Sequence, residues 1–528
     1  MTLNWLDRWF DRLSSGNPQV FRELKGRLKR RSIILATVGS LTFQLLLLLS
    51  FWSMLPTPRA VEDYAKQYNS YCTGDGVGRS FACVYDKFQN PLIDWQTWWW
   101  DIFQTLSWTL PGVLLVGGVY LLMSDLSKEE RRGTLNFIRL SPQTSQNILL
   151  GKLLGVPAIP YLAIGLAVPL HLIAAKSASV PLLNLLSVYL LAAFACACAY
   201  CAALLFALMG FQGWMSAAAI TVVYWSCCQV LQKIADWNLQ WFHLDSGHYY
   251  DCGLLVALLA LGIATYWLWQ AANRRYRNPT ATLLSKRQSY AMTLCFEVWL
   301  IGFVFRELTE HERPFNDLIV LGFFNLLWLV MLVAVITPQR QRLLDWARYR
   351  RERVVSAKKF WSRSLLNDLL WGEKSPALVA IGLNLLIALA VVIPWMLTWK
   401  KEEDLLRGLA TILLGAMYAL ICATIAQLTM FMKSQKPIIW TAGAIAGTII
   451  LPPVVLAVLQ IYPDKAPLAW LFSIRAFAVL EAGVSATMVF TAFLGHLAVL
   501  GTLTLRLTRQ LQKAGESEMK ALLAASKA

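Results

Sequence analysis

The sequence predicts an all-α polytopic membrane protein. Of its 528 residues, 57% are hydrophobic and only 15% are charged, and the mean hydropathy is +0.50. Apolar runs of about 20 residues recur along the whole chain, and a helix of that length crosses a hydrocarbon layer of about 30 Å. The 23 Trp, 17 Tyr and 24 Phe agree with this class, because aromatic side chains gather at both membrane–water interfaces.

We expect about twelve transmembrane helices, arranged as two six-helix halves, 33–271 and 272–528. With the N-terminus inside, the inner segments hold 35 of the 48 Lys and Arg residues, which predicts that both termini are cytoplasmic. The net charge of +17 is then mostly a topology signal that faces anionic lipid, and no nucleic-acid partner is expected. The expected spans are 33–54, 102–123, 153–175, 181–209, 215–235, 252–271, 290–305, 315–337, 377–399, 405–432, 437–461 and 484–506.

Residues 1–32 predict two amphipathic cytoplasmic helices. The pattern over 3–13 is typical of a helix that lies in the membrane interface. Residues 14–18 break this helix, because they end in Asn-Pro and the residue before a proline avoids the helical region. A second helix, 19–31, is interpreted either as a basic anchor before the first span or as a connecting helix that helps to hold a cytoplasmic partner.

A polar, partly basic segment, 124–152, separates the second and third spans. Its pattern predicts a short helix lying across the membrane surface. Glu129 and Glu130 are expected in the first turn of that helix, where carboxylates suit the positive end of the helix dipole. Pro142 is expected to end the helix after Ser141, and Thr144 is the expected N-cap of the next one.

Apolar side chains of this short helix form two pairs at helical spacing, Leu135 with Ile138 and Phe137 with Leu140. Together they predict an apolar surface that can insert into a cleft of another protein. Helices that merely turn around at a membrane surface rarely need a polar, partly basic segment of some 25 residues to do so. The segment therefore predicts a docking site for a separate motor subunit.

These residues resemble a known family. The run 129–135, with Leu140-Ser141-Pro142 and Leu150-Gly151-Lys152, is similar to the first cytoplasmic loop of type-2 ABC exporter permeases, whose coupling helix meets the ATP-binding subunit. The run 17–31 resembles the connecting helix that precedes the first span in that family. The resemblance implies docking residues Glu129, Glu130, Arg131, Arg132, Gly133, Thr134, Leu135, Ile138, Leu140, Ser141 and Pro142, and connecting-helix residues Phe21, Arg22, Glu23 and Leu24.

A nucleotide-binding motor is not expected in this chain. A phosphate-cradling loop needs the pattern G-x-x-x-x-G-K-[ST], whereas Gly151-Lys152 is followed by Leu153 and has no glycine five residues before Gly151. We therefore expect ATP and magnesium on a separate subunit, and no catalytic residue, cofactor or metal in this chain.

The two halves share a layout of two spans, a long cytoplasmic segment and four further spans, which predicts an internal duplication. The long segment of the second half, 338–376, holds ten basic residues interleaved with apolar ones. It is either a solvated or lipid-facing basic helix or a second docking surface. If both halves are permease-like, one chain with two ATPase subunits suffices; if only 1–271 is, a homodimer is required.

Cys72 and Cys83 lie in the expected outer loop 55–101 and are predicted to form a disulfide, since the outer compartment is oxidising; two free thiols are the alternative. The cysteines of the apolar spans are expected to pack as small side chains. In the loop 236–251, His243 and His248 beside carboxylates are a possible metal set, but an aromatic interfacial segment is the favoured interpretation. Residues 466–483 are expected to form a re-entrant or interfacial helix.

The sequence thus predicts the permease subunit of an ATP-driven ABC exporter in a bacterial plasma membrane. Its expected partners are an ATP-binding subunit, membrane lipid and a lipid, glycan, peptide or small-molecule substrate. Two alternatives stay open. One is an ion- or proton-coupled secondary transporter, which Glu297 at span depth supports thinly. The other is a membrane scaffold that transports nothing.

Overall fold

The computed structural model divides the chain into two compact units. Unit 1 comprises residues 1–238 and 248–277, and unit 2 comprises 239–247 and 278–528. Each unit is described by itself. The structure describes residues 16–57, 68–77, 80–86, 88–211, 213–234, 249–304, 314–356, 363–399, 401–434, 437–474, 476 and 484–514.

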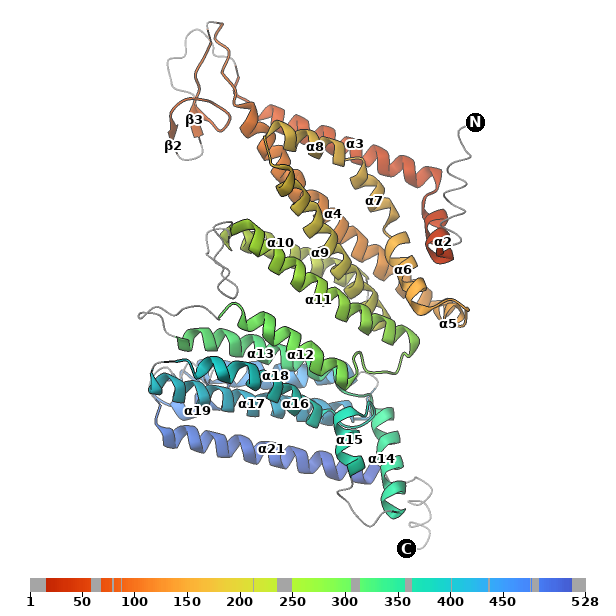
Figure 1. Ribbon diagram of the computed structural model, residues 1–528, viewed down its shortest axis with the longest axis vertical. Coiled ribbons are helices and arrows are strands. Elements are labelled where there is room, and N and C mark those ends of the chain that lie inside the picture. Colours follow the sequence, from red (N-terminus) through yellow and green to blue (C-terminus); the bar gives the residue numbers. More distant parts are fainter. Residues whose placement is uncertain are drawn as a thin grey trace. The chain divides into compact units, whose positions relative to one another are not determined.

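Unit 1 is a helical bundle with a small β-sheet (Figure 1). Figure 1 shows α2, α5 and α6 at one end of this unit and the strands at the opposite end, beyond the start of α4. The helices are α2 (Pro18–Arg27), α3 (Arg30–Ser53), α4 (Trp95–Arg131), α5 (Thr134–Arg139), α6 (Ser145–Gly155), α7 (Ala158–Gly165), α8 (Val168–Ser177), α9 (Leu182–Leu208), α10 (Gly213–Ile234) and α11 (Tyr249–Arg277).

Unit 2 is helical throughout its described residues. In Figure 1, α14 and α15 lie at one end of this unit and α19 lies at the other. The helices are α12 (Lys286–Ile301), α13 (Pro314–Ile336), α14 (Arg340–Ser356), α15 (Arg363–Trp371), α16 (Leu378–Met396), α17 (Glu402–Met430), α18 (Pro437–Val458), α19 (Pro467–Leu471) and α21 (Ala486–Ala514).

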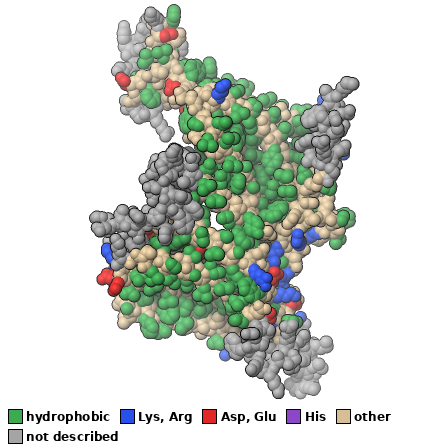
Figure 2. All heavy atoms as spheres, viewed as in Figure 1, with side chains coloured by type: hydrophobic (Ala, Val, Ile, Leu, Met, Phe, Trp, Pro, Cys, Tyr) green, Lys and Arg blue, Asp and Glu red, His purple; other side chains and the backbone are tan. Residues whose placement is uncertain are grey.

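The described helices include ten that are long and apolar enough to cross a membrane. They are 30–53, 95–131, 158–177, 182–208, 253–277, 315–336, 378–396, 402–430, 439–458 and 486–513. Their outer faces are apolar: Leu35 of α3, for example, is 73% exposed, and hydrophobic side chains cover much of the visible surface in Figure 2. Such faces suit lipid rather than water, so the prediction of a polytopic all-α membrane protein is confirmed.

The expected count of about twelve spans is not confirmed, since ten qualify among the described residues. The predicted span 215–235 is the helix α10, which is not among the ten, and the predicted span 290–305 is α12, which begins at Lys286 and has 16 residues. At 1.5 Å per residue α12 is about 24 Å long, shorter than a hydrocarbon core of about 30 Å. The third predicted span, 153–175, is divided between α6, α7 and α8, because Pro157 interrupts the helical hydrogen bonds and Pro169 lies at the start of α8.

Packing in unit 1 centres on α4. This 37-residue helix contacts α8, α9 and α10, and α11 packs against α9. Gly118 of α4 permits the closest approach: a Cβ there would overlap the ring of Tyr200 on α9, whose hydroxyl donates to the Leu114 carbonyl (2.8 Å). A side-chain hydrogen bond from Ser40 of α3 to the Ala163 carbonyl of α7 (2.7 Å) attaches the first span to the bundle.

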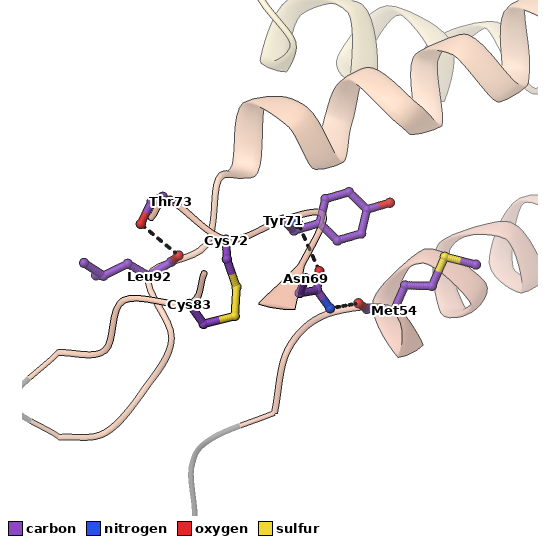
Figure 3. The surroundings of a disulfide bond; sticks show 7 residues. All are labelled: Met54, Asn69, Tyr71, Cys72, Thr73, Cys83 and Leu92. Carbon is purple, nitrogen blue, oxygen red and sulfur yellow. Dashed lines mark hydrogen bonds between the residues drawn. A yellow bond between two sulfur atoms is a disulfide. The ribbon is translucent and has the colours of Figure 1, made fainter. Parts of the chain in front are cut away.

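The loop between the first two spans, predicted to be the outer domain, contains a three-stranded antiparallel sheet of β1 (Tyr68–Asn69), β2 (Gly76–Val77) and β3 (Ser80–Ala82), in the order β1-β3-β2. Cys72 and Cys83 form a disulfide with a Cα–Cα distance of 4.8 Å (Figure 3). Asn69 donates to the Met54 carbonyl at the end of α3 (2.9 Å), and the Tyr71 hydroxyl donates to Asp101 of α4 (2.9 Å). The small domain is thereby attached to two helices.

Candidate functional site

The predicted connecting helix is α2. It is shorter than expected: it ends at Arg27 rather than residue 31, and α3 begins at Arg30, because Leu28 and Lys29 leave the helical conformation. Asn17 caps its N-terminus by accepting from the backbone N–H groups of the two residues that follow Pro18. Phe21 and Leu24 are half-buried, Arg22 is exposed and Glu23 is buried. Residues 3–13, predicted as an interfacial helix, lie outside the described residues.

The expected position of Glu129 and Glu130 in the first turn of the surface helix is wrong. Both residues belong to the last turn of α4, which continues to Arg131. Gly133 then adopts a left-handed conformation (φ 72°), which ends α4, and α5 begins at Thr134 with no acidic residue in its first turn. The two carboxylates therefore stand at the negative end of a helix dipole, where they need compensating cations.

The short helix α5 separates the predicted apolar residues into two faces. Leu135 and Ile138 are buried at 2% and 9% exposure, so they hold the helix on the unit. Phe137 and Leu140 are 79% and 85% exposed. The prediction that all four apolar residues form one exposed surface is therefore wrong. So short a helix stays attached to unit 1 only if one of its apolar pairs packs inward.

The ends of α5 also differ in detail from the prediction. The helix ends at Arg139, with Leu140 as its C-cap, before Ser141 and Pro142 are reached. Thr144 is the N-cap of α6, where its side chain accepts from the Asn147 N–H (3.2 Å), as predicted. Arg131, Arg132, Gly133 and Thr134 are all exposed, so cations border the exposed apolar pair.

An ionic cluster joins α2, α4 and α6 near the end of α4 that precedes α5. Lys152, 1% exposed, is at its centre. The Lys152 Nζ lies 2.8 Å from a carboxylate oxygen of Asp125, 2.8 Å from one of Glu129 and 3.4 Å from one of Glu23. Two arginines of α2 complete the cluster. The residues of the ionic cluster are Arg22, Glu23, Arg27, Asp125, Glu129 and Lys152.

The charges of the ionic cluster balance around one buried ammonium group. Burial favours the neutral form of Lys152, but the carboxylates of Asp125, Glu23 and Glu129 outweigh this effect and raise the pKa of Lys152 above its ordinary 10.5. Lys152 therefore stays charged at neutral pH. The three carboxylates are close enough together to suggest a metal site. However, the ammonium group of Lys152 already pairs with an oxygen of each carboxylate, so these carboxylates do not fit a metal ion as ligands.

Two glycines of α6 let α2 approach closely enough for these ion pairs. A Cβ on Gly151 would lie 2.6 Å from the Gln19 side chain, and one on Gly155 would lie 2.5 Å from the Cβ of Glu23. Both distances are shorter than real contacts allow. Gly151 therefore has a packing role in this structure. Gly155, four residues later on the same face of α6, has the same role one turn further along.

Sequence reasoning missed four members of this arrangement, Lys152 among them. Asp125 and Arg27 form an ion pair (2.5 Å), and Gly155 admits Glu23, but none was predicted as a site residue. The i, i+4 spacing of Asp125 and Glu129 would have shown that both carboxylates share a face of α4. No sequence signal indicated that Lys152 would face them.

The second predicted docking segment, 338–376, contains two helices, α14 and α15, and residues 357–362 between them are outside the described residues. Arg350 of α14 pairs with Asp368 of α15 (3.4 Å). The buried Lys286 of α12 donates to Ser375 (2.7 Å) and to the carbonyls of Leu369 and Pro376 (2.6 and 3.0 Å). This end of unit 2 is thus held by a lysine among neutral oxygens, unlike the carboxylates around Lys152.

The remaining predicted features are only partly described. Asp236, His243, Asp245 and His248 lie outside the described residues. Of the segment 466–483, the structure describes a five-residue helix, α19, that contacts α18 and α21. Cys196 and Cys201 are buried in α9.

Comparison of the chain with protein-family models, curated proteins and solved structures finds no match. The functional argument therefore depends on the residues and geometry described above.

Proposed function

We propose that this chain is the membrane-spanning permease subunit of an ATP-driven ABC exporter, and that a separate ATP-binding subunit docks on α5. The observation that carries the proposal is the outward pair Phe137 and Leu140, 79% and 85% exposed, on a helix otherwise anchored to the bundle. Two large apolar side chains exposed outside the predicted spans are costly in water, and they have the character of interface anchors.

The chemistry around α5 specifies the partner surface. Exposed Arg131 and Arg132 flank the apolar pair, and Arg139 lies over the ring of Tyr276 (5.3 Å). A matching partner has an apolar cleft with an acidic rim, because opposite charges across an interface steer association and fix its register.

The same geometry supports a mechanical role for α5. It follows α4 after two residues, and α4, about 56 Å long at 1.5 Å per residue, runs from there to the outer domain. The ionic cluster joins the far end of α4 to α2 and hence to the first span. A nucleotide-driven movement of the docked subunit would therefore displace α2, α4 and α6 together, as a rigid body rather than as separate helices.

Co-purification in mild detergent tests this proposal. The tagged wild-type chain should bring down a polypeptide with a G-x-x-x-x-G-K-[ST] motif, and Phe137→Ala with Leu140→Ala should lose it. Loss of an anchor worth about 2 kcal/mol weakens binding about 30-fold. The control is Leu366→Ala on α15, which removes another exposed apolar side chain (61% exposed). If this variant also lost the ATP-binding polypeptide, unit 2 would dock a motor subunit as well. If wild type brings down no such polypeptide, or the double variant retains it, the proposal is wrong.

A further inference from the structure

Polar side chains follow the buried face of α12 in unit 2. Ser289, Thr293 and Glu297 are each 0% exposed, and they recur every four residues, or about 6 Å along the helix. Thr293 donates to Asn384 of α16 (2.7 Å), and Asn384 donates to Ser289 (3.1 Å). The first two polar groups are thus paired with each other through Asn384, and Glu297 is the next position along the same face.

The carboxyl group of Glu297 is incompletely paired. It accepts one hydrogen bond, from the Asn325 amide of α13 to Oε2 (3.3 Å). Its Oε1 and the Oδ1 of Asn325 are both buried without a hydrogen-bond partner among the described residues. Within the same part of the chain Glu297 forms no ion pair. An ionised carboxylate in such surroundings is costly, because no cation among the described residues compensates its charge.

Among the residues that the structure describes, the helices around Glu297 supply no compensating cation. The helix α16 has no ionisable side chain, and α13 contributes only the acidic Asp317, eight residues before Asn325. The other ionisable groups of α12 are Lys286, Arg287, Tyr290 and Cys295. Lys286 and Arg287 lie in the first turn of α12, at the end of the helix away from Glu297. Lys286 donates a hydrogen bond to Ser375, which follows α15. The helix α15 carries the ionisable residues Arg363 and Asp368.

A cavity lies against Asn325, the hydrogen-bond partner of Glu297. It has a volume of about 80 Å³ and is lined by α13, α16 and α17, with Asn325 and Thr411 as its polar groups. A single water needs about 10–15 Å³ of such space. A second cavity of about 70 Å³ shares Gly322 and Gly415 with the first and is bordered by the ionisable Tyr418 and His496. The first cavity therefore offers space for water next to Asn325, with two polar groups to hold it.

We propose that Glu297 is a proton-binding site inside unit 2, with Asn325 as its hydrogen-bond partner and the two cavities as its access route. A proton from water forms an O–H bond with the carboxylate, and ionisation returns it to water. A metal cation is disfavoured, because hard cations take about six or more oxygen ligands and only two unpaired oxygens are present. The site is independent of motor docking, since α5 and Glu297 belong to different units.

Infrared spectroscopy of the full chain in lipid nanodiscs tests this site. With ¹³C-labelled glutamate, the wild-type protein at neutral pH should show the C=O band of a protonated glutamic acid. Glu297→Gln should lose this band and still fold, because glutamine has nearly the shape of a protonated glutamate. The control Glu403→Gln, which alters an exposed carboxylate at the start of α17, should retain the band.

If Glu297→Gln does not fold, Asn325→Ala replaces it. Loss of the hydrogen bond to Oε2 should then move the band to higher frequency. A wild-type spectrum without the protonated band at neutral pH overturns the proposal. A protonated band that survives Glu297→Gln also overturns it. Where Glu297→Gln does not fold, a band whose frequency is unchanged in Asn325→Ala overturns it instead.

Discussion

Replacing Lys152 with methionine tests the ionic cluster most severely. The change keeps the length of the side chain but removes the ammonium group from three carboxylates. Removing one partner of a buried ion pair costs about 3–5 kcal/mol, because the other charge stays buried without compensation. Glu23 is only 9% exposed, but Asp125 and Glu129 are 22% and 16% exposed and partly solvated. We therefore expect the lower end, about 3 kcal/mol.

The assay is thermal unfolding in detergent, followed by a thiol-reactive fluorophore that reports on buried Cys196 and Cys201 in unit 1. A loss of about 3 kcal/mol should lower the melting temperature by roughly 6 °C or more. Adding Asp125→Asn and Glu129→Gln to Lys152→Met should recover part of the loss, since the unpaired charges are then removed as well.

The matched control is Lys128→Met, which removes an exposed lysine of α4 near the same cluster and should leave the melting temperature unchanged. If Lys152→Met melts together with the wild type, or no worse than Lys128→Met, the central place of Lys152 is refuted. The same conclusion follows if the added neutral substitutions lower stability further.

Three further predictions concern the outer domain, the bundle and unit 2. Cys72→Ser should lower the unfolding free energy by about 2–3 kcal/mol, because the disulfide closes a short loop, and mass spectrometry should find one additional free thiol. Gly118→Ala should cost about 1–3 kcal/mol because its Cβ would overlap the Tyr200 ring, whereas Gly117→Ala, whose Cβ would have a 3.6 Å contact, should be tolerated in the same melting assay. Burial lowers the pKa of Lys286 to about 7, with Asp368 opposing this in part. Above that pH the folded state binds fewer protons than the unfolded state, so the free energy of unfolding rises with pH. Relative to Lys286→Met, the wild type should gain up to roughly 1.4 kcal/mol per pH unit between about pH 7 and pH 9.

Hydropathy and spacing predicted most of the membrane helices, because a run of about 20 apolar residues has few alternatives to a span. The predicted boundaries were wrong where a proline or a helix end decides them. The third span begins at residue 158 rather than 153, after Pro157, and α12 has 16 residues, which is shorter than a typical hydrocarbon core requires. The N-cap at Thr144 was predictable, since capping depends on neighbouring residues alone.

The candidate site was predicted in location but not in geometry. Residues 129–142 and α2 do lie around one end of unit 1, but which apolar pair faces outward depends on how α5 packs, and no local pattern determines that. The helix α4 continues to Arg131, eight residues beyond the expected end of the second span at 123, and ends before Gly133. The ion pair between Lys152 and Glu23 joins residues 129 positions apart in sequence, and such a contact follows only from the folded structure.

Photo-crosslinking from the position of Phe137 tests the central claim most directly. A benzophenone side chain there, in cells, should form a covalent product with a polypeptide that carries a G-x-x-x-x-G-K-[ST] motif, identified by mass spectrometry. The same group at Leu45, a 58% exposed residue of the first span, should give lipid products instead. If Phe137 crosslinks only to lipid, or only to proteins without that motif, the account of α5 as a motor-docking helix is contradicted.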